Sequence, residues 1–267
     1  MTHRHPLNRQ ATFIMAVFHI GALAALFFTT RNRIILGFSV WALVSSLGVG
    51  VGFHRLLTHR GYKTYRWVEY ALAVIGSLAR QGLPSVWVMI HRMHHKWTEV
   101  EGWDPHTPRD GKWWSHMDWM IHPDPTFQSR AILQKWVPDL IRQPFYRKRF
   151  VEWLPTATLA TICLIFGGLP AVLWGVALPV TLGWHQTWLV NSATHIWGYR
   201  RFNTKDDSRN LWWVAILSWG EGWHNGHHHD QVSARHGLAW YEVDVNYYLI
   251  KAMKVVGLAW DVYEAKL

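Results

Sequence analysis

Apolar stretches long enough to cross a membrane alternate with polar stretches along this chain of 267 residues. Residues 12–30 and 34–53 contain no acidic residue, lysine or arginine, and each has about the 20 residues that a membrane-spanning helix needs. Three residues separate them, which predicts a helical hairpin. Buried helices of a large soluble protein are the alternative, but apolar runs of this length argue against it.

A third apolar stretch has no charged residue from 155 to 184 and continues weakly beyond that point. It is too long for a single membrane span. Glycine and proline interrupt it near Gly168 and Pro170, which favours a turn there. We therefore predict two further spans, at about 155–172 and 174–193, which makes four in all.

The basic residues predict how these spans are oriented. Residues 54–150 contain 15 lysines and arginines and residues 196–267 contain 8, whereas the link between the first two spans contains two. The positive-inside rule then places the long polar segments and both termini in the cytoplasm, as in a protein of the inner membrane. We predict an all-α membrane protein with one domain over 1–267, in which 54–150 and 196–267 form a helical cytoplasmic cap.

Composition agrees with a membrane protein and limits its chemistry. The chain has 20 tryptophans, and tryptophan concentrates at membrane–water interfaces. Its formal net charge of +10 suits an anionic membrane surface or an acidic partner protein, and no nucleic-acid-binding motif accompanies the charge. The single cysteine, Cys163, excludes an internal disulfide and an all-cysteine zinc or iron–sulfur site.

Histidines are concentrated in three short stretches of the predicted cap, which are HRLLTHR (54–60), HRMHHK (91–96) and HNGHHH (224–229). In the second stretch, histidines at positions i, i+3 and i+4 share one helix face. His94 and His95 are about 100° apart around the helix axis, so they can face two different metal ions. His54 and His59 are five residues apart, so the helix must end or loosen between them.

Such clusters favour metal binding. Neutral imidazole is a ligand of zinc, copper, iron and nickel, although a single cluster is weak evidence. Three clusters on one side of a membrane would repel one another when protonated, and a bound ion makes the packing favourable. Eight or nine histidines exceed the four ligands of a structural zinc site and fit two ions. A dinuclear site beside a membrane suggests iron and dioxygen, but the spacing alone does not select iron over zinc.

Three longer stretches around these histidines, together with NSATHIWG (191–198), closely resemble the membrane-bound acyl desaturases of the stearoyl-CoA and the cyanobacterial and plastid acyl-lipid Δ9 type. They are GVGFHRLLTHRGYK, IHRMHHKWTEVEGWDPHTPRDGKWWSHMDWM and EGWHNGHHHDQVSARHGLAWYEVDV. The resemblance implies a four-span fold whose cap holds two iron ions (Fe2+/Fe3+), with O2 as co-substrate. It implies nine ligands and a water held by Asn191; the nine are His54, His59, His91, His94, His95, His195, His224, His227 and His228. How these ligands divide between the irons stays open.

Other polar residues are candidates for positions outside the ligands. Asp104 and Glu221 can orient ligand imidazoles through the other ring nitrogen, or act as surface or capping carboxylates. His106 and His116 belong to the family-like DPH and WWSH signatures. They are candidates for contacts with the metal-ligand side chains or with lipid headgroups. His229 stands where the family usually has a small residue, so it is an additional ligand or, as we expect, an outer or surface residue.

The resemblance implies an enzyme that removes two hydrogens from adjacent methylenes of a saturated C16–C18 acyl chain, carried by lipid or by CoA, and leaves a cis double bond at Δ9. The sequence has no flavin or dinucleotide fingerprint and no fused haem domain, so a ferredoxin-like or cytochrome b5-like carrier with its reductase must supply electrons. Two alternatives remain. A diiron acyl hydroxylase would use the same ligands, and a non-enzymatic membrane metal-binding protein would need more polar residues in its spans than His19 and His185.

Overall fold

The apolar stretches form long helices in the computed structural model, which describes residues 5–266. Within that range, three helices are long and apolar enough to cross a membrane: Arg9–Phe28, Arg31–Thr58 and Phe150–His195. They comprise α1 (Arg9–Ala25) with η1 (Leu26–Phe28), α2 (Arg31–Ala42) with the π-helical η2 (Leu43–Thr58), and α8 (Phe150–Val172), η7 (Leu173–Ala177), α9 (Leu178–Ser192) and η8 (Ala193–His195). The hydroxyl of Thr30, between the first two helices, accepts a hydrogen bond from the N–H of Arg33 and so caps α2.

These helices expose large apolar side chains. Phe27, in η1 at the end of the first long helix, is 87% exposed, and Phe166, two residues before Gly168 in α8, is 85% exposed. Such a surface is unfavourable in water and favourable in the hydrocarbon layer of a bilayer. The helices therefore fit a membrane protein.

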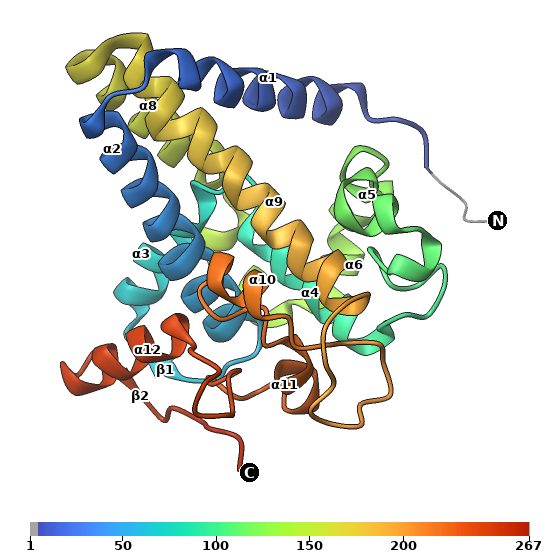
Figure 1. Cartoon of the computed structure of the whole chain (residues 1–267). Coiled ribbons are helices and arrows are strands. Elements are labelled where there is room, and N and C mark those ends of the chain that lie inside the picture. Colours follow the sequence, from blue (N-terminus) through green and yellow to red (C-terminus); the bar gives the residue numbers. More distant parts are fainter. Residues whose placement is uncertain (1–4, 267) are drawn as a thin grey trace.

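The third long helix is broken in the middle. A straight helix of its 46 residues would be roughly 70 Å long, about twice the thickness of a bilayer. Gly168 has φ 66° and ψ −168°, which is not helical, and Pro170 follows it closely. This break confirms the turn that was predicted near Gly168. In Figure 1 the chain reverses there, and α9 runs back toward the cap. The count of four spans stays a prediction.

The cap is built from short elements connected by turns. Between the second and third long helices lie β1 (Lys63–Thr64), α3 (Arg66–Ser77), α4 (Pro84–Trp97), η3 (Pro108–Asp110), η4 (Trp114–Asp118), α5 (Trp119–Ile121), η5 (Pro125–Gln128), α6 (Arg130–Trp136), α7 (Pro138–Ile141) and η6 (Pro144–Arg147). After the third long helix come α10 (Trp212–Leu217), α11 (His224–His229), α12 (Val245–Val255) and β2 (Ala259–Trp260). Strands β1 and β2 pair antiparallel and join the two parts of the cap.

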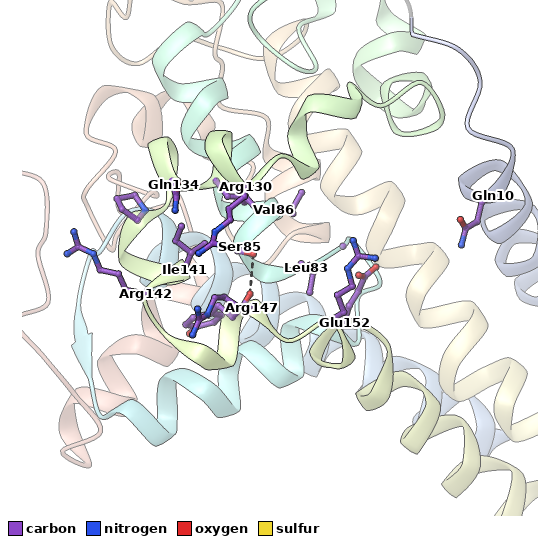
Figure 2. Close-up of a pocket in the computed structure, with 15 residues that line it drawn as sticks. Gln10, Leu83, Ser85, Val86, Arg130, Gln134, Ile141, Arg142, Arg147 and Glu152 are labelled. Atoms are coloured by element: carbon purple, nitrogen blue, oxygen red, sulfur yellow. Dashed lines mark hydrogen bonds between the residues drawn. The ribbon is translucent and has the colours of Figure 1, made fainter.

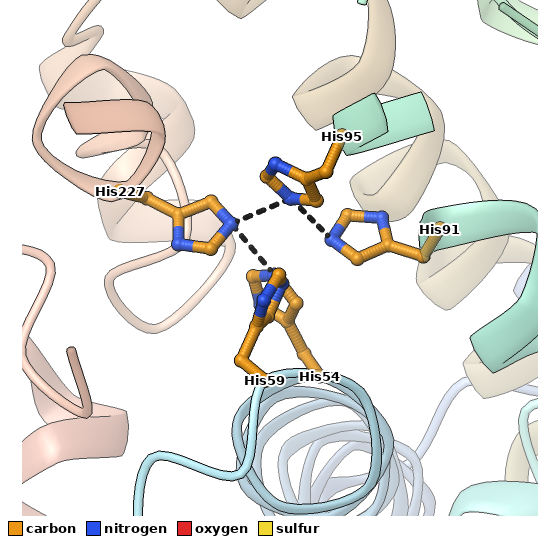
Figure 3. A group of neighbouring side chains, drawn as sticks. All are labelled: His54, His59, His91, His95 and His227. Atoms are coloured by element: carbon orange, nitrogen blue, oxygen red, sulfur yellow. Dashed lines mark hydrogen bonds between the residues drawn. The ribbon is translucent and has the colours of Figure 1, made fainter. Parts of the chain in front are cut away.

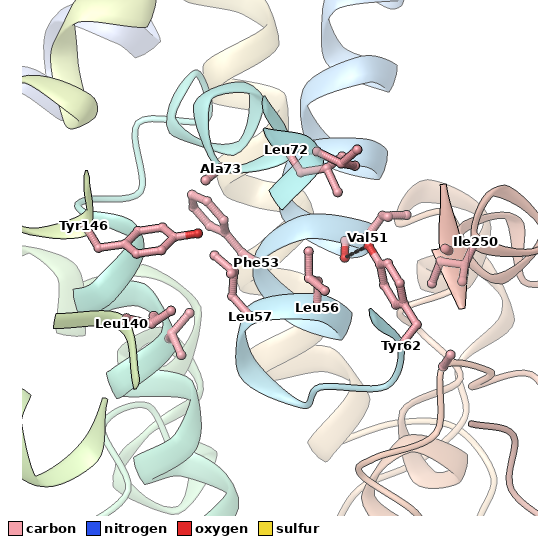
Figure 4. Close-up of a cluster of buried hydrophobic side chains, with 14 of the residues drawn as sticks. Val51, Phe53, Leu56, Leu57, Tyr62, Leu72, Ala73, Leu140, Tyr146 and Ile250 are labelled. Atoms are coloured by element: carbon pink, nitrogen blue, oxygen red, sulfur yellow. Dashed lines mark hydrogen bonds between the residues drawn. The ribbon is translucent and has the colours of Figure 1, made fainter. Parts of the chain in front are cut away.

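The main hydrophobic core surrounds η2, which extends from the membrane bundle into the cap (Figure 4). Phe53 and Leu57 of η2 are fully buried, and Leu72 of α3 and Ile250 of α12 pack in the same cluster. The backbones of η2 and α3 lie very close, because a Cβ on Gly48 would come within 2.6 Å of Gly76. The glycine-rich stretch 48–52 thus serves close helix packing. The core fixes η2, and with it the first histidine stretch, relative to the cap.

Candidate metal centre

Four elements bring the nine histidines together. They come from η2 and its C-terminal end, α4, η8 and α11, and they form two groups in which one ring nitrogen per residue lies within 4.8 Å of the others. The five-histidine group consists of His54, His59, His91, His95 and His227. The four-histidine group consists of His94, His195, His224 and His228. His94 and His95 fall into different groups, as their angular separation on α4 predicts.

The π-helical geometry of η2 explains how His54 and His59 reach the same group. In a π-helix the hydrogen bonds join residues five apart, which brings them onto one face. The backbone N–H of His59 donates to the carbonyl oxygen of His54 at 3.2 Å, and the ring centroids of the two histidines are 4.8 Å apart. The helix therefore loosens between them, and it continues to Thr58, beyond the predicted end of the apolar span at Phe53.

Within each group, several Nε2 atoms face one another. In Figure 3 the Nε2 atom of His227 lies 3.1 Å from that of His54 and 2.9 Å from that of His95. The other ring nitrogen of His54, Nδ1, faces a carboxylate oxygen of Glu221. A carboxylate only accepts, so Nδ1 carries the hydrogen of the neutral ring and Nε2 has a lone pair. Facing lone pairs repel one another unless a cation lies between them.

The distances between these nitrogens fit a shared ion. Two nitrogens that bind one ion at about 2.1 Å and at right angles to each other are about 3.0 Å apart. In the four-histidine group the Nε2 atom of His224 lies 3.0 Å from those of both His195 and His228. In the five-histidine group the Nε2 atom of His59 is buried and has no hydrogen-bond partner among the described residues. Both donor sets therefore fit a metal ion.

Carboxylates hold the Nδ1 side of four of these rings. His54 donates to Glu221, and His94 donates to Asp104 at 3.0 Å, which are the two carboxylates that the sequence suggests. His195 donates to Glu99 at 2.8 Å, and His228 donates to Asp206 at 3.0 Å. Sequence reasoning missed Glu99 and Asp206. Glu99 follows α4 directly, which was a usable signal, whereas Asp206 lies in a polar loop that resembles any surface segment.

Electrostatics lower the pKa of three of these carboxylates, Asp104, Asp206 and Glu221, and keep most of the imidazoles neutral. Burial alone would raise the pKa of Asp104, but His94, His106 and a backbone N–H together hold it well below its usual range. The pKa of Asp206 is lowered in the same way by His228 and Ser208, against the effect of burial. Burial, assisted by repulsion from neighbouring rings, lowers the pKa of five histidines well below 6.5: His59, His91, His95, His224 and His227. Neutral imidazole is the form that binds metal.

A buried arginine connects Glu221 to the rest of the cap. Arg55 is fully buried and donates hydrogen bonds to Glu221 at 2.8 Å and to Asp244 at 3.0 Å. Its guanidinium also lies 3.2 Å from the Nδ1 atom of His236, whose ring stacks beside that of His227. His236 therefore contributes to the order of this part of the cap. Arg55 lies between two histidines of the first stretch, and no sequence pattern indicated its buried role.

The remaining candidates lie in different surroundings. The backbone N–H of His106 donates to Asp104, and its ring centroid is 4.4 Å from that of His94. His116 belongs instead to a separate chain of contacts, in which its Nε2 lies 3.1 Å from Nδ1 of His185 and its Nδ1 lies 3.1 Å from the hydroxyl of Ser192. His185 in turn contacts His19, which agrees with the expectation of hydrogen-bonded histidines within the membrane helices.

His229 points away from both groups. It is exposed, and its ring stacks on that of Phe202 with centroids 3.9 Å apart. Its two predecessors in α11, His227 and His228, are buried and belong to different groups. This geometry agrees with the outer position that we expect for His229.

An apolar cavity of about 270 Å³ ends at the histidines. His91, His106 and Asn191 line one part of it, and most of the remaining wall is aromatic or aliphatic. The wall residues from α1, α4, α9 and the cap include Ile14, Met15, Trp87, Ile90, Trp119, Phe127, Trp184 and Trp188. Asn191 thus lies in the cavity wall, four residues before His195 of the four-histidine group. We call this space the apolar cavity.

Comparisons with known proteins agree with this arrangement. The sequence model of the fatty acid desaturase family, described as "Fatty acid desaturase", matches residues 27–253. The chain is 45% identical over 248 residues to an sn-2 palmitoyl-lipid 9-desaturase of Nostoc sp. (strain 36), covering 91% of this chain and 86% of that protein. It is 40% identical over 260 residues to an sn-1 stearoyl-lipid 9-desaturase of Anabaena variabilis, covering 96% and 94%. It is 41% identical over 233 residues to an acyl-CoA C20 Delta5-desaturase of Anemone leveillei, covering 84% and 72%.

Proposed function

The chain belongs to the fatty acid desaturase family and is an acyl desaturase, and from this premise we propose that it introduces a cis double bond at Δ9 into saturated C16–C18 acyl chains. The observation that carries the proposal is the apolar cavity, whose wall includes Asn191 and His91, a member of the five-histidine group. A flexible acyl chain has many chemically equivalent methylenes. An apolar cavity whose wall includes a histidine of the reactive centre can select one pair of them by position alone.

Two iron ions are the metal ions that we propose for the two histidine groups. The five-histidine group would hold one ion, and the four-histidine group would hold the other, while Asn191 would reach a metal ion through a water molecule. When bound, a pair of iron ions supplies the redox chemistry that lets O2 accept hydrogen from an unactivated methylene. The overall reaction consumes O2, two external electrons, two protons and two substrate hydrogens, and yields the alkene and two molecules of water.

The protein's own residues prepare this chemistry by position. Glu99, Asp104, Asp206 and Glu221 each hold the hydrogen of one ring on Nδ1 and so leave Nε2 available for a metal ion. The tryptophans of the apolar cavity exclude water from the acyl chain. The electrons have to come from a separate carrier, and the net charge of +10 suits an acidic ferredoxin-like or a cytochrome b5-like partner with its reductase.

We further propose that the protein crosses the inner membrane four times, with both termini and the cap in the cytoplasm. The break at Gly168 supports two spans in the third long helix. The excess of lysine and arginine in 54–150 and 196–267 supports the cytoplasmic position of the cap.

Expression in a bacterial host that lacks its own membrane desaturase tests the function. Fatty acid methyl esters would be analysed by mass spectrometry with location of the double bond, and His95→Ala would serve as the inactive control. We expect cis-Δ9 monoenes of 16 and 18 carbons. Hydroxylated acids in place of alkenes would show that the protein is a hydroxylase, and an unchanged profile with correctly folded, iron-loaded protein would contradict acyl chemistry altogether.

A further inference from the structure

A second and larger cavity, of about 950 Å³, lies where two of the long helices begin (Figure 2). Its wall is formed by α4, α6, α7, η6 and the start of α8, with Gln10 of α1 on the far side. Gln10 is the second residue of the first long helix and Glu152 is the third residue of the last. Nearby Trp153 is 54% exposed, as is usual for tryptophan at a membrane–water interface. The cavity therefore lies at the level of the lipid headgroups.

Arginines dominate the charge of this cavity, which we call the arginine cavity. Four of its wall residues are arginines and one is acidic, Glu152; the four are Arg130, Arg142, Arg147 and Arg149. All four are exposed, and within the part of the chain that the structure describes none of them forms an ion pair with a carboxylate. Other arginines of the cap are paired. Arg60 and Arg92 both bind Asp139, and Arg109 binds Asp207. The positive charge of the arginine cavity thus has no partner within the protein.

The arginine cavity and the apolar cavity share part of their walls. Gly82, Val86 and Glu152 line both of them. Gly82 has φ 93°, and a Cβ added there would meet no atom within 4 Å, so the space at the junction is open. A molecule with a charged end in one cavity and an apolar chain in the other can therefore be accommodated continuously.

The spacing along α4 agrees with such a molecule. Pro84 begins α4 beside the junction, and His91 of the five-histidine group lies seven residues further on, a rise of roughly 10 Å. The eight carbon–carbon bonds from the carboxyl carbon to C9 of an acyl chain also span about 10 Å when extended. An ester group held at the junction would place C9 near His91.

We propose that the arginine cavity binds the phosphodiester headgroup of a glycerophospholipid, whose acyl chain enters the apolar cavity past Gly82 and Val86. The proposal rests on the proposed desaturase function and names its substrate class. Guanidinium groups bind phosphate through paired, charge-assisted hydrogen bonds, whereas a neutral sugar headgroup would leave the positive charges uncompensated. The position of the cavity, at the start of two membrane helices, favours a lipid that is already in the bilayer over a water-soluble acyl carrier.

Lipid binding by the purified full-length protein tests this site without any need for activity. Native mass spectrometry in detergent would compare phosphatidylglycerol with monogalactosyldiacylglycerol of the same acyl chains. We expect the wild type to bind phosphatidylglycerol at least about tenfold more tightly. The double variant Arg142→Gln/Arg147→Gln should lose this preference, because each charge-assisted hydrogen bond contributes about tenfold or more. Arg200→Gln/Lys254→Gln removes the same charge from exposed positions outside the cavity and should keep the preference.

Activity on defined substrates then separates the possible carriers. Iron-loaded protein with ferredoxin and its reductase would receive the stearoyl forms of phosphatidylglycerol, monogalactosyldiacylglycerol and CoA. We expect faster conversion of the phospholipid, and loss of this advantage in Arg142→Gln/Arg147→Gln. Equal use of the neutral galactolipid, or conversion of acyl-CoA alone, would overturn the proposal. If the wild type keeps its preference in binding and converts none of the three, the lipid site stands and the desaturase function fails.

Discussion

The two histidine groups hold their rings in different ways. In the four-histidine group, three of the four rings donate Nδ1–H to a carboxylate of their own; these carboxylates are Asp104, Glu99 and Asp206. In the five-histidine group, only His54 has such a partner, and the charge of that partner, Glu221, is offset by Arg55. The four-histidine group therefore has fewer ligands, but the orientations of most of them are fixed, and its environment is more negative. The five-histidine group has an additional ligand in place of hydrogen-bonded support.

Removal of one ligand from each group should have the largest effect. His95 and His224 form a matched pair, because the Nδ1 atom of each is buried without a hydrogen-bond partner among the described residues. We expect His95→Ala and His224→Ala each to abolish desaturation, as His94→Ala should. His224→Ala leaves three ligands and should lose its metal ion, whereas His95→Ala leaves four and should retain more metal. Product analysis and metal analysis check both; equal metal loss would remove the difference between the groups.

Neutralising the carboxylates should separate stability from metal affinity. Glu221→Gln leaves the fully buried Arg55 with Asp244 as its remaining carboxylate, and we expect a loss of about 3 kcal/mol or more in the free energy of unfolding. Asp206→Asn keeps an amide oxygen that can accept from Thr204 and Ser208 but removes the charged partner of His228. We therefore expect metal affinity to fall by about 10- to 100-fold with little change in stability. Thermal unfolding and chelator competition measure the two quantities. A large stability loss in Asp206→Asn alone would reverse the comparison.

As the pH falls, the four-histidine group should lose its metal ion before the five-histidine group does. Burial lowers the pKa of His94, but Asp104, with Glu99 and Asp206, outweighs burial and raises it above 6.5. Below that raised pKa a proton competes with the metal ion at His94, and affinity falls by up to about tenfold per pH unit. Burial lowers the pKa of His95, and likewise of His59, His91 and His227, well below 6.5, so at these four ligands of the five-histidine group a proton competes only at lower pH.

Metal content measured between pH 8 and pH 5.5 tests this order. The His224→Ala protein, with an intact five-histidine group, and the His95→Ala protein, with an intact four-histidine group, serve as references for the two sites. Loss of metal from the five-histidine group before the four-histidine group would show that the carboxylates do not control the competition.

The smallest effect is expected at the end of α11. His229 is exposed and stacks on Phe202, so His229→Ala should keep activity within about twofold of the wild type and keep both metal ions. The desaturation rate of purified protein checks this. An inactive but folded His229→Ala protein would mean that His229 contributes to one of the groups after all.

The sequence was sufficient for features that depend on local pattern. Apolar runs predicted the long helices and the turn at Gly168, and the angular spacing on α4 predicted that His94 and His95 face different groups. Asp104 could be suggested because it follows His94 by ten positions in the same segment.

Features that depend on distant packing could not be predicted in this way. Glu99 is 96 positions from His195, and no periodicity connects them. Arg55 looks like an ordinary basic residue after a membrane span until its burial against Glu221 and Asp244 is known. The stretch 138–150 is basic in the sequence, but the arginine cavity is formed only because that stretch packs near Gly82 and Val86.

The number of metal ions per chain tests the central claim most directly. Full-length protein purified from iron-replete cells would be analysed by native mass spectrometry, with its desaturation rate measured on the same sample. Two histidine groups predict about two iron ions per chain in active protein, and one fewer in His224→Ala. One ion or fewer in fully active wild-type protein would contradict a site made of two groups.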